Sequence, residues 1–134
     1  MDRRNLQIVS DFRELRVYQL AFKSAMRIFH LSKAWPSIER FSLTDQIRRA
    51  SRSVCGNIGE AWRKRRYPAS FVSKLSDSDG EAGETLIWLD FAKECGYLAE
   101  NDWTELRDNY NHICAQLVTM MNQSDQWCGN FARK

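Results

Sequence analysis

The chain has 134 residues, of which 43% are hydrophobic and 28% are charged, and its formal net charge is +3. These values are typical of one globular domain, which we assign to residues 1–134. No segment approaches the run of about 18 apolar residues that a membrane span needs, and residues 1–15 lack the pattern of a signal peptide. We therefore expect a cytoplasmic protein that has no membrane partner.

The charges are distributed unevenly along the chain. Residues 1–67 contain 15 Lys or Arg and 6 Asp or Glu, whereas residues 68–134 contain 5 and 11, which gives net charges of +9 and −6. Such a division indicates an anionic partner for the basic half, subunits that meet basic face to acidic face, or both.

The four cysteines are widely spaced and form no C-x-x-C pair: Cys55, Cys95, Cys114 and Cys128. We interpret them as reduced thiols in a cytosolic protein. The alternative is a zinc site that combines distant cysteines with His30 or His112.

The first helix is predicted over residues 13–34. Asp11 followed by Glu14 resembles a capping box, and Pro36 requires the helix to end before it. Apolar side chains recur every three or four residues and predict the buried seam Leu15, Tyr18, Phe22, Ala25 and Phe29.

The second helix is predicted over residues 43–66, with the seam Leu43, Ile47, Ala50, Val54, Ile58 and Ala61. Its opposite side carries Asp45, Arg48, Arg52, Gly56, Gly59, Arg63 and Arg66. Glycine within a helix costs about 1 kcal/mol relative to alanine, so two glycines on this side indicate that another backbone or a phosphate strand approaches closely. The alternative is an ordinary solvated face.

The third helix is predicted over residues 69–95, with the seam Phe71, Leu75, Ser78, Ala82, Thr85, Leu89 and Ala92. A second stripe carries Asp77, Glu81, Glu84 and Trp88, with Phe91 nearby. Like charges four residues apart disfavour an isolated helix, so we expect cationic partners for these carboxylates, supplied at a subunit interface. A solvated face is the alternative, and a metal site or acid pair is a weaker one.

The fourth helix is predicted over residues 102–123, with the seam Trp103, Leu106, Tyr110, Ile113, Leu117 and Met120. We expect flexible ends at residues 1–10 and 124–134. Four amphipathic helices joined by short turns predict an all-α fold, an antiparallel up-down-up-down four-helix bundle.

No pattern of an enzyme is present. Neither His30 nor His112 follows a Glu by three residues, as the histidines of di-iron bundles do. The chain also lacks a G-x-x-x-x-G-K-[ST] loop and a G-x-S-x-G elbow. We expect no catalytic residue, no metal and no cofactor.

The basic end of the second helix is the candidate for function. We predict that a phosphate backbone of RNA or DNA binds Arg63, Lys64, Arg65 and Arg66, together with Arg49 and Tyr67. A subunit interface is predicted to join Arg48, Arg52, Gly56 and Gly59 to Asp77, Glu81, Glu84 and Trp88. The alternative is an assembly module that ignores nucleic acid and uses these charges only for subunit contacts.

Three blocks of this sequence resemble one family. Residues 42–65, SLTDQIRRASRSVCGNIGEAWRKR, are similar to the central motif of the four-helix-bundle proteins encoded in intervening sequences of bacterial 23S rRNA genes. The blocks FRELRVYQLA (12–21) and WLDFAKECGYL (88–98) match the family's first and third helices. The resemblance covers roughly residues 11–122.

This resemblance implies a homopentameric ring. It also points to a related branch, the accessory proteins of diversity-generating retroelements, which bind nucleic acid and a reverse transcriptase. Two departures are present: Cys55 replaces a common proline, and residues 76–84 are more acidic than that branch. We therefore expect a non-enzymatic, ring-forming protein that binds nucleic acid, with a reverse transcriptase as a further candidate partner.

Overall fold

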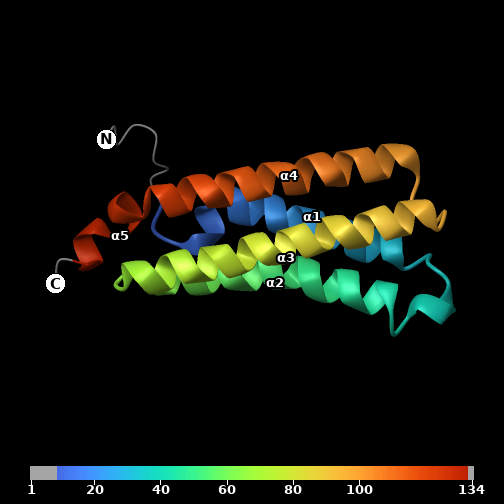
Figure 1. Cartoon of the computed structure of the whole chain (residues 1–134), viewed down its shortest axis with the longest axis horizontal. Coiled ribbons are helices and arrows are strands. Elements are labelled where there is room, and N and C mark those ends of the chain that lie inside the picture. Colours follow the sequence, from blue (N-terminus) through green and yellow to red (C-terminus); the bar gives the residue numbers. More distant parts are fainter. Residues whose placement is uncertain (1–8, 133–134) are drawn as a thin grey trace.

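The computed structural model describes residues 9–132, which form helices and no strand. Four long helices lie side by side along the length of the molecule (Figure 1). In chain order the elements are η2 (Phe12–Glu14), α1 (Arg16–Ser32), η3 (Ser37–Glu39), α2 (Leu43–Arg63), α3 (Pro68–Glu94), α4 (Glu100–Asn122) and α5 (Ser124–Ala132). The predicted all-α class is confirmed.

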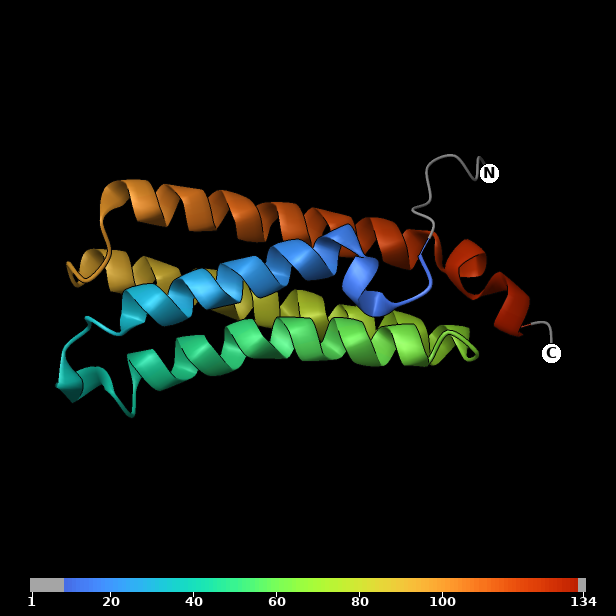
Figure 2. The same ribbon diagram turned by 180° about the vertical axis from the view of Figure 1, so that it is seen from behind.

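Successive long helices are connected at alternate ends of the molecule. The α1–α2 and α3–α4 connections lie at one end, and the α2–α3 connection lies at the other (Figures 1 and 2). At the α3–α4 connection Gly96 has φ of 81°, a left-handed conformation that favours glycine and ends α3. In the described residues no helix is both long enough and apolar enough to cross a membrane.

The core is formed largely by the predicted seams of α2, α3 and α4. Every predicted seam residue of α2 and α3 is buried, as are five of the six in α4. The exception is Trp103, which is half-buried beneath the cations of Lys93 and Arg107, at 3.8 and 4.7 Å from its ring centroid. Periodicity alone therefore identified the buried side of three helices.

For α1 the predicted seam is wrong. The side that enters the core is Val17, Ala21, Ser24 and Ile28, whereas Phe22 is 52% exposed. Leu15 is buried, but it precedes α1 in an extended conformation with ψ of 128°. Counting in steps of three and four residues from Leu15 starts before the helix begins. The count therefore picks residues next to the buried side of α1 instead of the buried side itself.

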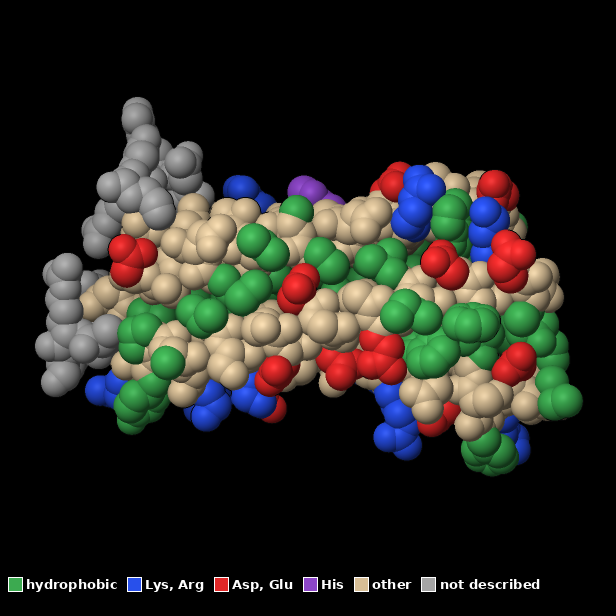
Figure 3. All heavy atoms as spheres, in the orientation of Figure 1, with side chains coloured by type: hydrophobic (Ala, Val, Ile, Leu, Met, Phe, Trp, Pro, Cys, Tyr) green, Lys and Arg blue, Asp and Glu red, His purple; other side chains and the backbone are tan. Residues whose placement is uncertain are grey.

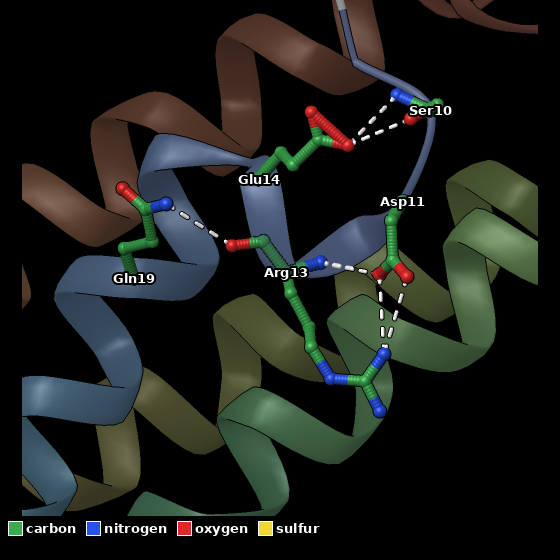
Figure 4. A network of polar contacts seen from close by, with 5 residues as sticks. All are labelled: Ser10, Asp11, Arg13, Glu14 and Gln19. Carbon is green, nitrogen blue, oxygen red and sulfur yellow. Dashed lines mark hydrogen bonds and ion pairs between the residues drawn. The ribbon is translucent and has the colours of Figure 1, made fainter.

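A small network of hydrogen bonds precedes α1 (Figure 4). Asp11 does not start α1; it accepts the Arg13 N–H at 2.9 Å and caps η2. Glu14 accepts both the N–H and the hydroxyl of Ser10, and the Gln19 amide donates to the Arg13 carbonyl at 3.1 Å. These bonds close η2 on itself and tie it to the first turn of α1, in place of a continuous first helix.

The structure differs from the sequence interpretation again after Asn122. Residues 124–132, predicted to be flexible, form α5, in which Cys128 is buried and the Trp127 ring lies edge-on to Trp62 at 6.1 Å. Nine residues are too few to show a clear helical period, which is why the pattern failed. The remaining predicted flexible residues at the extreme ends, 1–8 and 133–134, lie outside the described residues.

The core yields a stability prediction at Tyr110. Its hydroxyl is buried without a hydrogen-bond partner among the described residues. We therefore expect Tyr110→Phe to leave the free energy of unfolding unchanged or to raise it by up to about 1 kcal/mol. Ile113→Ala, one turn further along the same seam, should cost about 2–5 kcal/mol. Urea unfolding measures both, and a loss of more than about 1 kcal/mol in Tyr110→Phe contradicts the prediction.

Candidate functional site

Three exposed cations and one exposed ring at the α2–α3 turn form one candidate surface, here called the cationic corner: Arg63, Lys64, Arg66 and Tyr67. α2 ends at Arg63 and Pro68 starts α3, so the intervening residues turn sharply at the end of the molecule. Within residues 9–132, Arg63 and Arg66 form no ion pair, and Tyr67 is 61% exposed. Lys and Arg side chains gather along this end of the lower edge in Figure 3.

Arg65 behaves differently from its neighbours. Its guanidinium lies 3.4 Å from the centroid of the Trp62 ring, and its Nε donates to the Trp62 carbonyl at 2.8 Å. Burial lowers the pKa of Arg65. Arg65 is therefore occupied within its own subunit, and the buried Trp62 ring is not open to an incoming base.

Arg49 does not join the cationic corner. It pairs with Asp45 at 2.9 Å, and it precedes Arg63 by a distance of about 21 Å along the helix axis. The predicted nucleic-acid residues are thus brought together in part. Arg63, Lys64, Arg66 and Tyr67 are exposed at one turn, Arg65 stacks on Trp62 beside them, and Arg49 is remote.

A second surface, the arginine–aromatic face, lies on α1 and α2: Tyr18, Phe22, Met26, Phe29, Arg48 and Arg52. The guanidinium carbons of Arg48 and Arg52 lie 4.9 and 5.8 Å from the centroid of the Phe29 ring. Arg48 is half-buried and its Nε donates to the Ser32 hydroxyl at 2.9 Å, whereas Arg52 is exposed. A hollow of about 260 Å³ opens between these side chains.

The sequence interpretation missed this surface because it placed the α1 aromatics in the core. The sequence did contain a sign of it: the apolar residues of α1 cover a wider arc of the helix than the core-facing side can bury, so some of them must be exposed.

The two glycines of α2 have different surroundings. A Cβ atom on Gly59 would lie 3.8 Å from the Phe12 ring of the same chain, so η2 covers this position. At Gly56 a Cβ would meet no atom within 4 Å. Of the two glycines predicted to lie in a subunit interface, Gly59 already contacts its own subunit, and Gly56 is open.

The acidic stripe of α3, Asp77, Glu81, Glu84 and Trp88, forms a third surface. Glu84 accepts the Trp88 indole N–H at 3.3 Å, and Lys74 lies 4.0 Å from Asp77. Glu81 makes no ion pair within the described residues. Burial raises the pKa of Glu81, and the nearby charges of Glu84 and Asp77 raise it further. Acidic side chains are spread over this face in Figure 3.

Trp88 and Phe91 extend the acidic stripe with apolar surface. Their ring centroids are 5.9 Å apart, and Phe91 is 55% exposed. No ion pair inside the described part of the chain joins this stripe to Arg48 or Arg52. The acidic stripe and the arginine–aromatic face thus carry opposite charges, each beside exposed aromatic rings, and they lie on different sides of one subunit.

Groups suited to metal chemistry do not come together. Residues 9–132 contain no cluster of three or more His, Cys, Asp or Glu side chains that could hold a metal ion. The described cysteines are free thiols, and burial raises the pKa of Cys55 and of Cys114 to about 11. Both thiols are therefore protonated at neutral pH.

Comparison with known proteins gives a consistent result. The chain is similar to a solved protein of unknown function from the S23 ribosomal protein family of Bacteroides thetaiotaomicron VPI-5482. The two share 26% identity and superimpose with a TM-score of 0.71 over 78% of this chain and 97% of the other. No match was found among curated protein sequences.

A family model matches most of the chain. Residues 13–119, which include α1, α2, α3 and nearly all of α4, match the 23S rRNA-intervening sequence proteins. The matched region contains the cationic corner, the arginine–aromatic face and the acidic stripe. The chain therefore belongs to the 23S rRNA-intervening sequence protein family.

Proposed function

We propose that this protein is a non-enzymatic, self-associating, antiparallel up-down-up-down four-helix bundle that binds nucleic acid at its cationic corner. The observation that carries the nucleic-acid proposal is that Arg63 and Arg66 are exposed and make no ion pair with any described carboxylate. Exposed guanidinium groups that are not engaged in ion pairs attract phosphate without sequence preference. Tyr67 adds an exposed ring on which a base can stack.

Self-association is supported by complementary faces at matching heights. α2 begins and α3 ends at the same end of the molecule (Figure 1). The Ser78 hydroxyl donates to the Val54 carbonyl, so these two residues are level. Counted from them toward the start of α2, Arg52 and Arg48 lie about 3 and 9 Å away, and Glu81 and Glu84 lie about 4 and 9 Å away. A second copy turned about an axis parallel to the bundle therefore brings arginines to carboxylates without sliding along the bundle.

Such a contact joins two different faces, so it propagates from copy to copy. A contact between two different faces closes into a ring when the rotation from one copy to the next divides a full turn. We favour a homopentamer as the closed ring. We further propose that the ring is located in the cytoplasm and that it binds a protein partner such as a reverse transcriptase.

A second candidate is an assembly module that does not bind nucleic acid. The observation that favours it is that Arg65 stacks on Trp62, Arg49 pairs with Asp45, and Arg48 bonds Ser32. These contacts reduce the charge available to phosphate below what the sequence indicates. Titration with oligonucleotides separates the two candidates.

The cationic corner yields the first prediction of this proposal. The triple variant Arg63→Ala, Lys64→Ala, Arg66→Ala should weaken binding of a single-stranded oligonucleotide at least about tenfold, and it should reduce the slope of log K against log salt by about 2. Fluorescence anisotropy at several salt concentrations measures both quantities, and light scattering should show an unchanged oligomer.

The matched control removes three exposed cations elsewhere: Lys23→Ala, Lys33→Ala and Arg40→Ala. It changes the net charge equally but should leave the salt slope close to that of the wild type. Equal losses in both triple variants contradict a local site.

The interface yields a charge-reversal prediction. Arg52→Glu and Glu81→Lys should each dissociate the oligomer because each places like charges together, and the double variant should partly restore it. Arg52 is preferred to Arg48 because Arg48 also bonds Ser32 within its own chain. Arg49→Glu, an exposed control on the same helix, should leave the mass unchanged. Light scattering that gives the mass of one chain for the wild type refutes the interface.

The acidic stripe also predicts how assembly depends on pH. The pKa of Glu81 is raised in a single subunit, and a guanidinium from another copy lowers it again. The oligomer then binds fewer protons than separate copies, so association should strengthen as pH rises from about 4 to about 6. Light scattering across this range tests the sign. Glu81→Gln should flatten the dependence, and assembly that weakens as pH rises overturns the assignment.

A further inference from the structure

A hollow of about 290 Å³ lies between α1, α4 and α5 and has no role in the surfaces described above. Its lining residues come from the start of α1, the end of α4 and α5. These segments lie at the same end of the molecule as the α2–α3 turn (Figures 1 and 2). Leu15, Val17 and Met120 provide apolar walls, and half of the ten lining residues are polar or charged, among them Arg16, His112 and Gln116. Trp127 adds an indole N–H. A hollow that combines apolar walls with polar groups is a usual form of a small-ligand site, and this volume suits a flat ring.

Two of the polar groups lining this hollow are buried and unsatisfied. Gln116 Oε1 and Trp127 Nε1 have no hydrogen-bond partner in the described part of the chain. One is an acceptor and the other is a donor. Because buried polar atoms are nearly always hydrogen-bonded, the pair indicates a guest that offers a donor and an acceptor along one edge.

The hollow is connected to the cationic corner through two indoles. The Trp127 ring lies 6.1 Å from the Trp62 ring in an edge-on arrangement. Trp62 in turn lines a second hollow of about 210 Å³ together with Arg63, Arg65 and Arg66. A phosphate held by Arg63 and Arg66 therefore lies on one side of this indole pair, and the slot lies on the other.

We propose that this hollow receives one unpaired nucleobase of the strand whose phosphates bind the cationic corner. Each base presents a hydrogen-bond donor next to an acceptor on its Watson–Crick edge, which matches Gln116 Oε1 and Trp127 Nε1. The base faces pack against Leu15 and Met120. A base in a duplex is stacked and paired and does not reach such a slot, so the protein selects single-stranded or looped nucleic acid. This inference rests on the proposed nucleic-acid binding.

The test compares a single-stranded oligonucleotide with an abasic strand of equal length and charge, using the full chain at fixed salt. Wild type should bind the base-containing strand at least about tenfold more tightly. Gln116→Leu should remove most of that preference without lowering the melting temperature, because it deletes an unsatisfied buried atom. Trp127→Phe, which keeps a ring but loses the N–H, is the second variant, should the first fail to fold. Gln46→Leu at the opposite end is the matched control.

Each outcome has a distinct meaning. Base binding in the hollow is supported if the wild type prefers the base-containing strand, if Gln116→Leu or Trp127→Phe loses that preference, and if Gln46→Leu keeps it. Equal binding of both strands overturns the slot and leaves phosphate binding intact. A preference that survives both variants places the base elsewhere and also overturns it. Binding of neither strand rejects the proposed function together with this inference.

Discussion

The close packing of α2 against α3 is the contact on which the other features depend. These two helices share the most extensive contact of any pair in the described residues. Small buried side chains on them, such as Ala50, Ser51 and Ala82, suit a close approach. At the centre of the contact the Ser78 hydroxyl donates to the Val54 carbonyl at 2.8 Å in a fully buried position. A buried hydroxyl needs such a partner, so this bond disfavours sliding of one helix along the other. It thereby sets the heights of the charged groups on both helices.

With α2 fixed in this way, its arginines have different environments at its two ends. Near its start, Arg48 and Arg52 lie over Phe29 and beside an exposed aromatic stripe of α1. At its end, the chain turns before Pro68, and Arg63, Lys64 and Arg66 extend from the molecule. Arginine on an aromatic face suits a protein interface, whereas cations at a sharp turn suit phosphate. One helix therefore supports two proposed contacts that do not compete for the same side chains.

The sequence predicted the repeated features of the fold well. Regular spacing placed the seams of α2, α3 and α4, because each of these helices keeps one register from end to end. It failed at α1, because the buried Leu15 has an extended backbone and lies before the helix begins. It also failed at α5, a helix of only nine residues in which Cys128 is buried. The charge pattern also overestimated how many cations are available to a partner, because Arg65 and Arg49 are engaged within their own chain. Whether Arg65 stacks on Trp62 or Gly59 meets Phe12 depends on tertiary contacts that local spacing does not encode.

The central claim is that α2 presents one group of arginines to another copy of the chain and a second group to nucleic acid. Native mass spectrometry of the full chain mixed with a single-stranded oligonucleotide at low ionic strength tests both parts in one spectrum. The account predicts an assembly at a multiple of 15.7 kDa, five for the favoured ring, that retains bound oligonucleotide. A spectrum that contains only single chains without oligonucleotide contradicts it.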